Sequence, residues 1–246
     1  MRCRPTGRSV PRENEGDAKK NARGTQLLMT VLDNLSNVRT NIAEAARAAG
    51  RDPTDVTLLA VSKTVPAERV REALAAGQAL FGENYAQELR DKAREVEGAR
   101  WHFVGPLQRN KVKYVVGVAE LIHSVDSPAL LDEIAARADK LGVVQRCLVQ
   151  VNVGGEAQKS GCAPAGVPAL VRAFAARASV KCEGLMCIPP DGVPARAFFE
   201  NLAKLAAAEG LGTLSMGMSG DFAEAIAAGA TIVRIGTAIF GERQRR

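Results

Sequence analysis

A lysine at the end of an apolar segment is the most reactive group that the sequence offers. Lys63 follows the run TLLAV at 57–61, within LLAVSKT, where a buried strand would open into a loop. Burial of the lysine stem favours the neutral, nucleophilic amine over the ammonium ion. The alternative is a solvated lysine just past the end of a strand. Two segments near the end of the chain favour the reactive lysine.

These two segments, LSMGMSGD and VRIGTAIFG, are rich in glycine and follow predicted strands. Gly217 and Gly220 let the backbone approach a ligand closely, and the Ser219 hydroxyl can bond a ligand oxygen. Backbone N–H groups after Asp221 and at Gly236–Thr237 could add donors, which is typical of a phosphate site. The alternative is that Ser219 or Asp221 only caps a helix. A reactive lysine beside a phosphate site indicates a phosphorylated aldehyde cofactor.

An arginine inside an apolar strand is the third candidate. Arg234 lies two residues before Gly236, among Ile and Val. A buried guanidinium needs a partner, so a structural salt bridge is one interpretation. The other is that Arg234 donates to the ring nitrogen of a pyridine cofactor. It would then disfavour protonation of that nitrogen and weaken the ring as an electron sink.

The elements that must position these residues alternate along the chain. Several short apolar runs suit strands buried on both faces, and Ala-rich helical stretches between them end at glycine, as in ALAAG (73–77) and ADKLG (138–142). The eight predicted strands are 56–62, 78–81, 101–105, 120–125, 146–153, 182–188, 213–217 and 231–236.

This order predicts an α/β protein with a single (β/α)8 TIM barrel, preceded by an extra helix over about 26–49. A doubly wound open sheet is the alternative, but no GxGxxG follows the first strand. We expect short helices in the last two units. We assign residues 26–243 to the barrel and residues 1–25 to a disordered N-terminal extension, because the latter are polar and precede the amphipathic pattern.

The polar and glycine-rich motifs all follow predicted strands. SKT, GENY, GPLQRNK, HSVD, EAQKSG, IPP, GMSGD and GTAIFG come after the first to the eighth strand in turn. Barrel enzymes build their sites at this carboxyl face. The motifs should therefore converge at one end of the barrel.

Charge and hydropathy argue against nucleic acids and membranes. The net charge is +6, but seven basic and three acidic residues fall in the first 24 and three basic residues in the last four, so residues 25–242 carry −1. Aromatic content of 4% leaves few stacking platforms. No apolar run approaches the ~20 residues that span a bilayer. We expect a cytoplasmic protein.

The cysteines and histidines do not predict a metal site. Five cysteines show no CxxC spacing, and the only histidines, His102 and His123, lie in separate strand-like runs. We expect free thiols and structural histidines. Cys182 and Cys187, five residues apart, should point to opposite faces of one strand.

Taken together, LLAVSKT, FGENYAQE, WHFVGPLQRNK, HSVD, QKSG, GLMCIPP and the two glycine-rich segments closely resemble the pyridoxal phosphate homeostasis family. The resemblance runs from about Leu27 to Glu242. It implies a barrel like the cofactor domain of alanine racemase, with Lys63 matching the lysine that forms the internal aldimine with pyridoxal 5'-phosphate (PLP). The residues that it places around ring and phosphate are Asn84, Ser219, Arg234, Gly236 and Thr237.

The implied role is to carry and buffer PLP in vitamin B6 homeostasis, without enzymatic turnover. We expect a monomer that interacts with PLP and apo forms of PLP-dependent enzymes, and not with nucleic acid or membranes. Lys159, in an unusual loop after the fifth strand, is expected to be a solvated lysine or a second, transient cofactor contact.

Two other functional classes stay open. A PLP-dependent racemase or lyase would need a second acid/base opposite Lys63, and only Tyr85 and Tyr114 are available as tyrosines. We also expect no chain to be left for a second domain that could supply one. A phosphate-binding barrel enzyme without PLP would lack a bound chromophore.

Overall fold

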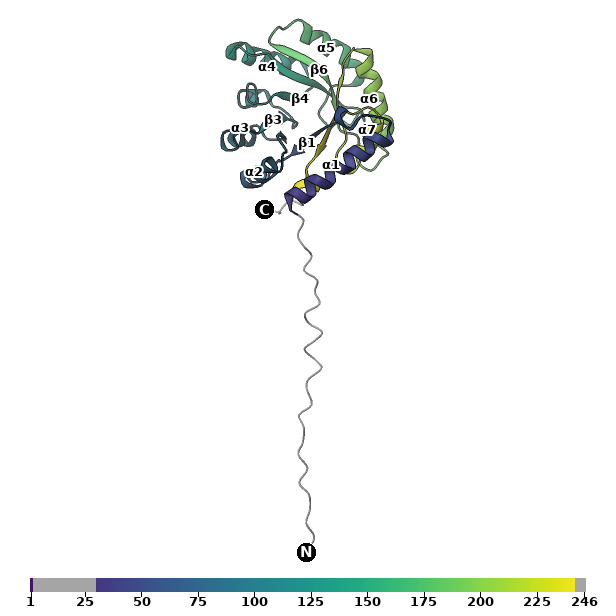
Figure 1. Ribbon diagram of the computed structural model, residues 1–246. Helices are drawn as coiled ribbons and strands as arrows, with labels where there is room; N and C mark the ends of the chain where they lie inside the picture. The colour runs from purple at the N-terminus through teal and green to yellow at the C-terminus, as the bar shows by residue number, and fades with distance from the viewer. Residues whose placement is uncertain (2–29, 242–246) are drawn as a thin grey trace.

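A closed barrel of eight parallel strands forms the centre of the molecule (Figure 1). The computed structural model describes Met1 and residues 30–241. Each strand pairs with the next along the chain, and the first pairs with the last. The strands are β1 Thr57–Val61, β2 Leu80–Glu83, β3 Arg100–Phe103, β4 Leu121–Val125, β5 Gln145–Val151, β6 Val180–Cys187, β7 Thr213–Ser215 and β8 Ile232–Ile235. The predicted (β/α)8 barrel and all eight strands are confirmed.

Helices cover the outside of the barrel. The α-helices are α1 Val31–Ala48, α2 Ala67–Ala75, α3 Ala86–Glu95, α4 Pro128–Leu141, α5 Val167–Ala175, α6 Arg196–Ala208, α7 Phe222–Ala227 and α8 Thr237–Phe240. Three 3-10 segments, η1 Pro53–Asp55, η2 Arg109–Tyr114 and η3 Pro164–Gly166, complete the described elements. As predicted, the last two helices are short, with six and four residues.

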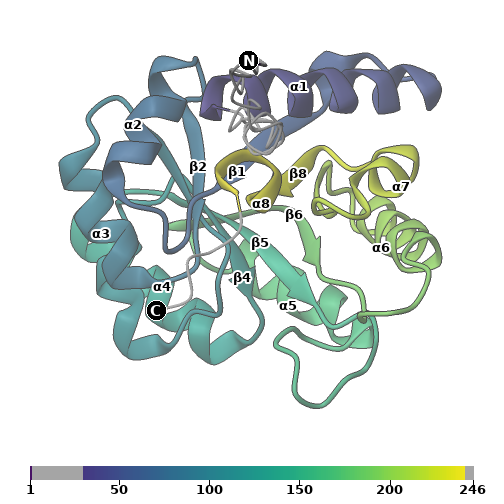
Figure 2. The ribbon, with the colours of Figure 1, turned by 90° about the horizontal axis from the view of Figure 1, so that it is seen from below.

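The extra N-terminal helix packs against α7 and α8, the helices of the last two barrel units. Thr30 and Asp33 form a reciprocal capping box that starts α1. The helix contacts α2, α7 and α8, as Figure 2 shows. The Asn34 side-chain amide donates to the Ile239 carbonyl at 2.9 Å. The buried stripe of α1 comprises Val31, Leu35, Val38, Ile42 and Ala46. The helix thus covers the part of the barrel beside the short helices α7 and α8.

Glycines end the helices as the pattern predicts. Gly77 and Gly142 have φ of 81° and 65°, a left-handed conformation that side chains with a Cβ rarely adopt. The N–H of Gly142 bonds back to the carbonyl of Asp139. These two helices therefore stop where the chain must turn back toward the next strand.

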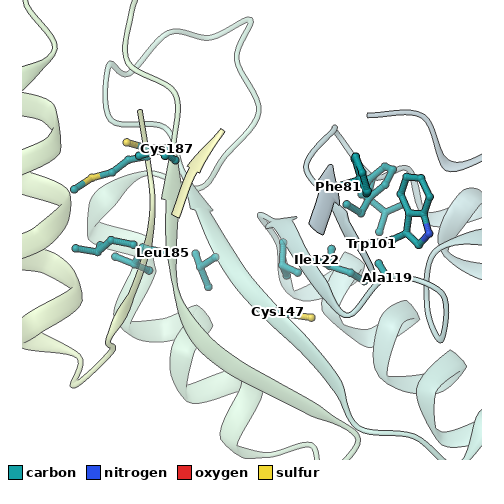
Figure 3. Close-up of a cluster of buried hydrophobic side chains, with 14 of the residues drawn as sticks. Phe81, Trp101, Ala119, Ile122, Cys147, Leu185 and Cys187 are labelled. Carbon is teal, nitrogen blue, oxygen red and sulfur yellow. The ribbon is translucent and has the colours of Figure 1, made fainter. Parts of the chain in front are cut away.

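Strand residues alternate between two hydrophobic clusters. The smaller cluster is made of residues from the strands and their exits, namely Leu59, Val104, Leu121, Leu148, Met186 and Ile232, and it fills the barrel interior. The larger cluster also contains helix residues and lies between the barrel and the helices. Figure 3 shows part of it, with Phe81 beside Trp101. A residue two positions before or after a member of the smaller cluster, on the same strand, therefore also faces the barrel interior.

The expectation for two cysteines is wrong. Cys182 and Cys187 both pack against the outer cluster. The register between β5 and β6 shifts after Cys182, where Leu148 pairs with Gly184, so Glu183 is an extra residue. Such a bulge reverses the alternation of faces, which the spacing of two cysteines does not reveal.

Some expectations fall outside the part of the chain that is described. They are the extension over 1–25, the beginning of the first helix at 26–29 and the end of the barrel domain at 242–243. Within the described residues, no helix is both long and apolar enough to cross a membrane.

Candidate functional site

A cavity of about 300 Å³ opens at the carboxyl ends of the strands and gathers the predicted site residues. Its lining includes all six of them: Lys63, Asn84, Ser219, Arg234, Gly236 and Thr237. These residues follow or belong to the first, second, seventh and eighth strands, which are neighbours in the closed barrel. Apolar lining residues that the sequence analysis did not single out are Val61, Val65, Val104, Ile188, Met218 and Phe240.

Lys63 enters the cavity because of strand alternation. Leu59 lies in the barrel interior, and Val61 and Lys63 follow at intervals of two residues and line the cavity. The chain then turns sharply at Thr64, the one described non-glycine residue with a positive φ, 63°. Its N–H donates to the Glu88 carboxylate at 2.7 Å. Such a strained turn next to a reactive side chain is typical of functional sites.

A buried ion cluster lies behind Lys63, on the helix side of the strands. Lys92 of α3 donates to Glu83 and Glu88, each at 2.7 Å, and to the Ser62 carbonyl at 2.6 Å. The Ser62 hydroxyl donates to Glu83 at 2.7 Å. Burial raises the pKa of Glu83 to about 7, although the Lys92 ammonium opposes this. The cluster therefore holds in place the two residues that flank Lys63 in the chain, Ser62 and Thr64.

This buried ion cluster was not predicted from the sequence. FGENYAQELRDK contains all three charged residues, but nothing in its spacing shows that Glu83 would face the helix layer. A possible signal is that Glu83 is a charged residue at the end of an otherwise apolar strand. Buried charges are rare unless they are paired.

Asn84 follows β2 and brings an unpartnered acceptor to the cavity. Its Oδ1 atom is buried and accepts no hydrogen bond from the described residues. The neighbouring strand exit passes very close, because a Cβ built on Gly105 would lie 2.1 Å from the Asn84 carbonyl oxygen. Only glycine allows this approach. A ligand donor would satisfy the amide oxygen.

The glycine-rich exits of β7 and β8 form the opposite wall. Ser219 and Gly220 are exposed and line the cavity next to Gly236 and Thr237. A Cβ on Gly236 would come within 2.8 Å of the Val61 carbonyl oxygen, so glycine permits the strands to close here. The first N–H groups of a helix lack intrahelical partners, and those of α8 begin at Thr237. This wall offers several donors to an anionic group.

Asp221 stabilises this wall in a way that the helix-cap alternative does not describe. Its carboxylate accepts from the Met218 N–H at 2.6 Å and makes no side-chain cap bond to α7. Asp221 occupies the N-cap position of α7, and Ser219 does not. Both residues belong to the loop that borders the cavity.

Arg234 is buried at the floor of the cavity, with 5% of its surface exposed. Its Nη1 donates to the Ser215 hydroxyl and its Nη2 to the Cys187 carbonyl, both at 2.8 Å. No carboxylate of the described chain lies within ion-pair distance of it. Burial lowers the pKa of Arg234. The salt-bridge interpretation is therefore not supported, and the guanidinium has only neutral partners.

A row of hydrogen bonds continues from Arg234 across the barrel interior. The Ser215 hydroxyl lies 2.9 Å from His123 Nδ1, and His123 Nε2 lies 3.0 Å from His102 Nδ1. Because Ser215 already accepts from Arg234, its proton is best donated to His123 Nδ1. His123 then donates through Nε2 to His102. Both rings are neutral in this arrangement.

The lowered pKa values of the two histidines agree with neutral rings. Burial lowers the pKa of His102 to about 4 and the pKa of His123 well below its usual value. Neither ring lines the cavity around Lys63. The prediction of structural histidines is consistent with this placement. Their connection to Arg234 could not be read from the sequence.

The remaining predicted groups lie elsewhere. Lys159 pairs with Glu156 at 2.7 Å and donates to the Pro189 carbonyl at 3.0 Å, so it is not a solvated lysine, and it does not line the cavity. No cluster of three or more metal-binding side chains occurs among the described residues. The four described cysteines are free, and burial raises the pKa of the Cys162 thiol to about 11.

Comparison with known proteins gives consistent matches. A family model described as alanine racemase, N-terminal domain, matches residues 34–244. The pyridoxal phosphate homeostasis protein of Pseudomonas aeruginosa is 47% identical over 224 residues, 88% of this chain and 97% of that protein. Its counterpart in Aquifex aeolicus is 44% identical over 227 residues, 88% of this chain and 100% of that protein.

Solved structures resemble the same barrel. PipY of Synechococcus elongatus, determined with PLP bound, superposes with a TM-score of 0.76 at 36% identity, covering 86% of this chain and 100% of that one. An alanine racemase of Clostridium difficile gives a TM-score of 0.69 at 15% identity, covering 87% of this chain and 58% of that one. The second similarity shows the fold alone.

Proposed function

Because the chain belongs to the family of pyridoxal phosphate homeostasis proteins, built on the alanine racemase N-terminal domain, we propose that it binds PLP and carries and buffers it as a non-catalytic protein. The observation that carries this proposal is the convergence of Lys63, Arg234 and the Ser219–Gly220 loop on one cavity. Each supplies a group that one part of PLP requires.

The residues of the cavity fit this cofactor. PLP has an aldehyde, a pyridine ring and a phosphate. Lys63 would hold the aldehyde through its primary amine, which could condense with it and release water. The donors of Ser219, Gly236 and Thr237 suit the phosphate, and the orphan Oδ1 of Asn84 can accept from a ring substituent. The apolar Val104 and Ile188 suit the faces of the ring.

We propose that Arg234 faces the ring nitrogen of PLP, which favours a carrier over a catalyst. PLP supplies an electron sink that depends on the charge near its ring nitrogen. A guanidinium donates to a neutral ring nitrogen and opposes its protonation. Ser215 and the Cys187 carbonyl hold the Arg234 fork in place. This favours a bound but poorly activating cofactor.

The alternative of a racemase or lyase receives little support from the cavity. Stereoinversion requires acid/base groups on both faces of the substrate carbon. Apart from Lys63, the described lining contains no Tyr, His, Cys, Asp or Glu. Tyr85 is 56% exposed and outside the lining, and Tyr114 borders a different cavity.

The decisive experiment is covalent mapping of the cofactor. The purified protein should show the absorbance of bound PLP, and borohydride reduction followed by peptide mass mapping should place the label on Lys63. Lys63→Ala should lose the label, whereas Lys159→Ala should keep it. Labelling of another lysine in the unmodified protein would refute the assignment.

The carrier role needs a separate test. The loaded protein should transfer PLP to an apo form of a PLP-dependent enzyme and show negligible racemisation across a panel of amino acids. Robust racemase or lyase turnover that Lys63→Ala abolishes would instead support the enzymatic alternative.

A further inference from the structure

The outer helical layer has a gap at the third barrel unit. The connection from β3 to β4 contains η2, six residues of 3-10 helix, where the flanking units have α3 and α4 with 10 and 14 residues. η2 contacts both of these helices. A cavity of about 810 Å³ lies between the three elements, away from Lys63. Its volume is within the range of small-molecule sites.

Positive charge gathers around this second cavity. Arg90 and Arg94 of α3, Lys113 of η2 and Arg137 of α4 all line it, and no carboxylate does. Arg90 pairs with its neighbour Asp91, which lies outside the lining. The other three cations form no ion pair with any described residue. A concave site with one sign of charge focuses its field and raises the local concentration of counter-ions.

The concentration of charge is unusual for this protein, because residues 25–242 carry a net charge near zero. An even distribution would give most cations an acidic neighbour, as in the Arg100–Glu120 and Arg146–Glu183 pairs. The second cavity therefore carries a local excess of positive charge that the average surface of the protein lacks.

Two buried donors in the same lining lack acceptors. Trp101 is 3% exposed, and its Nε1 is buried without a hydrogen-bond partner. The Nε atom of Arg137 is likewise buried and unpartnered. Native proteins satisfy nearly all such groups. Both residues line the second cavity, and a ligand with several acceptor oxygens would neutralise its cations.

We propose that the cavity between α3, η2 and α4 is a second binding site, which takes a small molecule bearing a multivalent oxyanion such as a diphosphate. Several cations arranged around one space suit an anion with more than one charge. The cavity volume of about 810 Å³ suits a small molecule. Tyr114 stacks against Arg90 and Lys113, at 5.0 and 5.2 Å, and so orients them at the rim.

The site contains its own reporter. Trp101 is the only tryptophan of the chain. Inorganic pyrophosphate is titrated into the full-length, PLP-loaded protein, in which the Lys63 cavity is already filled, and tryptophan emission is followed. We expect a saturable change. Arg94→Glu combined with Arg137→Glu should weaken binding by about tenfold or more, since each removes a charge-assisted contact.

The matched control reverses two positive charges elsewhere. Arg172→Glu combined with Lys204→Glu, at exposed positions of α5 and α6, should bind pyrophosphate like the unmodified protein. Line broadening of pyrophosphate in phosphorus NMR gives a readout independent of the tryptophan. An unchanged PLP spectrum shows that the double variant is folded.

Three results would overturn the proposal. They are no saturable response, equal affinity in the double variant, or the same response to sodium chloride at matched ionic strength. If PLP fails to bind at Lys63, the titration still tests this site, because the Arg94 and Arg137 dependence is separate from that cavity.

Discussion

Arg234 and Ser215, from adjacent strands β8 and β7, are joined by a 2.8 Å hydrogen bond inside the barrel. The bond gives the guanidinium at the cavity floor a neutral partner and ties it to the two buried histidines. The direction of the Arg234 fork is therefore set by residues that do not touch the cavity.

Ser215→Ala should disturb the Lys63 site without touching a ligand. The variant removes the acceptor of Arg234 Nη1, and a hydrogen bond to a charged group contributes about 1.5–3 kcal/mol. We expect weaker PLP binding and a changed absorption maximum of the bound cofactor. Absorbance titration measures both.

Ser124→Ala is the matched control for this change. Its hydroxyl is also buried, but it has no hydrogen-bond partner in the described structure. The control should leave the PLP spectrum unchanged. Equal effects of the two variants would mean that Ser215 has only a packing role.

Ser219→Ala should discriminate between phosphorylated and unphosphorylated ligands. Loss of one hydrogen bond to a charged phosphate should weaken PLP binding by about 1.5–3 kcal/mol. Binding of pyridoxal, which lacks the phosphate, should be almost unchanged. Competitive titration of the two ligands measures the difference, and equal weakening would contradict the placement of the phosphate.

Lys92→Met should destabilise the fold by about 3–5 kcal/mol, because it leaves Glu83 buried without its cation. The raised pKa of Glu83 sets the pH dependence. Its contribution to stability is present below pH 4.5 and is lost as the pH rises through about 7. The variant should therefore lose more stability at pH 8 than at pH 5.

Chemical denaturation at the two pH values checks this expectation. Adding Glu83→Gln to the Lys92→Met variant should recover part of the stability, because the buried charge is then gone. A double variant less stable than Lys92→Met at both pH values would argue against an uncompensated carboxylate.

The paired histidines should make the fold sensitive to acid. The pKa of His102 is depressed from 6.5 to about 4, so its contribution is present above pH 6.5 and is lost as the pH falls. The loss should reach about 2 kcal/mol by about pH 5. Glu83 acts in the opposite direction over this range, so a matched comparison is needed.

The comparison is between the unmodified protein and His102→Asn with His123→Asn. Melting temperatures from pH 8 to pH 5 should fall less steeply in the double variant, even if it is less stable throughout. Parallel slopes would show that the histidines do not carry the acid sensitivity.

Deletion of residues 1–25 should leave PLP binding and the melting temperature unchanged. We propose that the barrel domain covers residues 26–243, and α1 receives its cap from Thr30. Thermal denaturation and absorbance of the truncated protein provide the test. Loss of folding or of the cofactor would assign a structural role to the N-terminal residues.

The sequence by itself determined the barrel and the membership of its cavity. Apolar runs separated by helices that end in glycine allow few arrangements other than closed parallel strands, and motifs after parallel strands must meet at one end. Lys63 and the glycine-rich exits could thus be placed at one end of the barrel from their positions after predicted strands.

Only the tertiary structure decided which groups satisfy one another. The bulge at Glu183 placed Cys182 and Cys187 on the same face of β6, because one extra residue changes the alternation. The bonds from Arg234 through Ser215 to His123, and the gap beside η2, join residues that are far apart in sequence. Such contacts depend on barrel closure and on side-chain direction, which no local pattern of residues encodes.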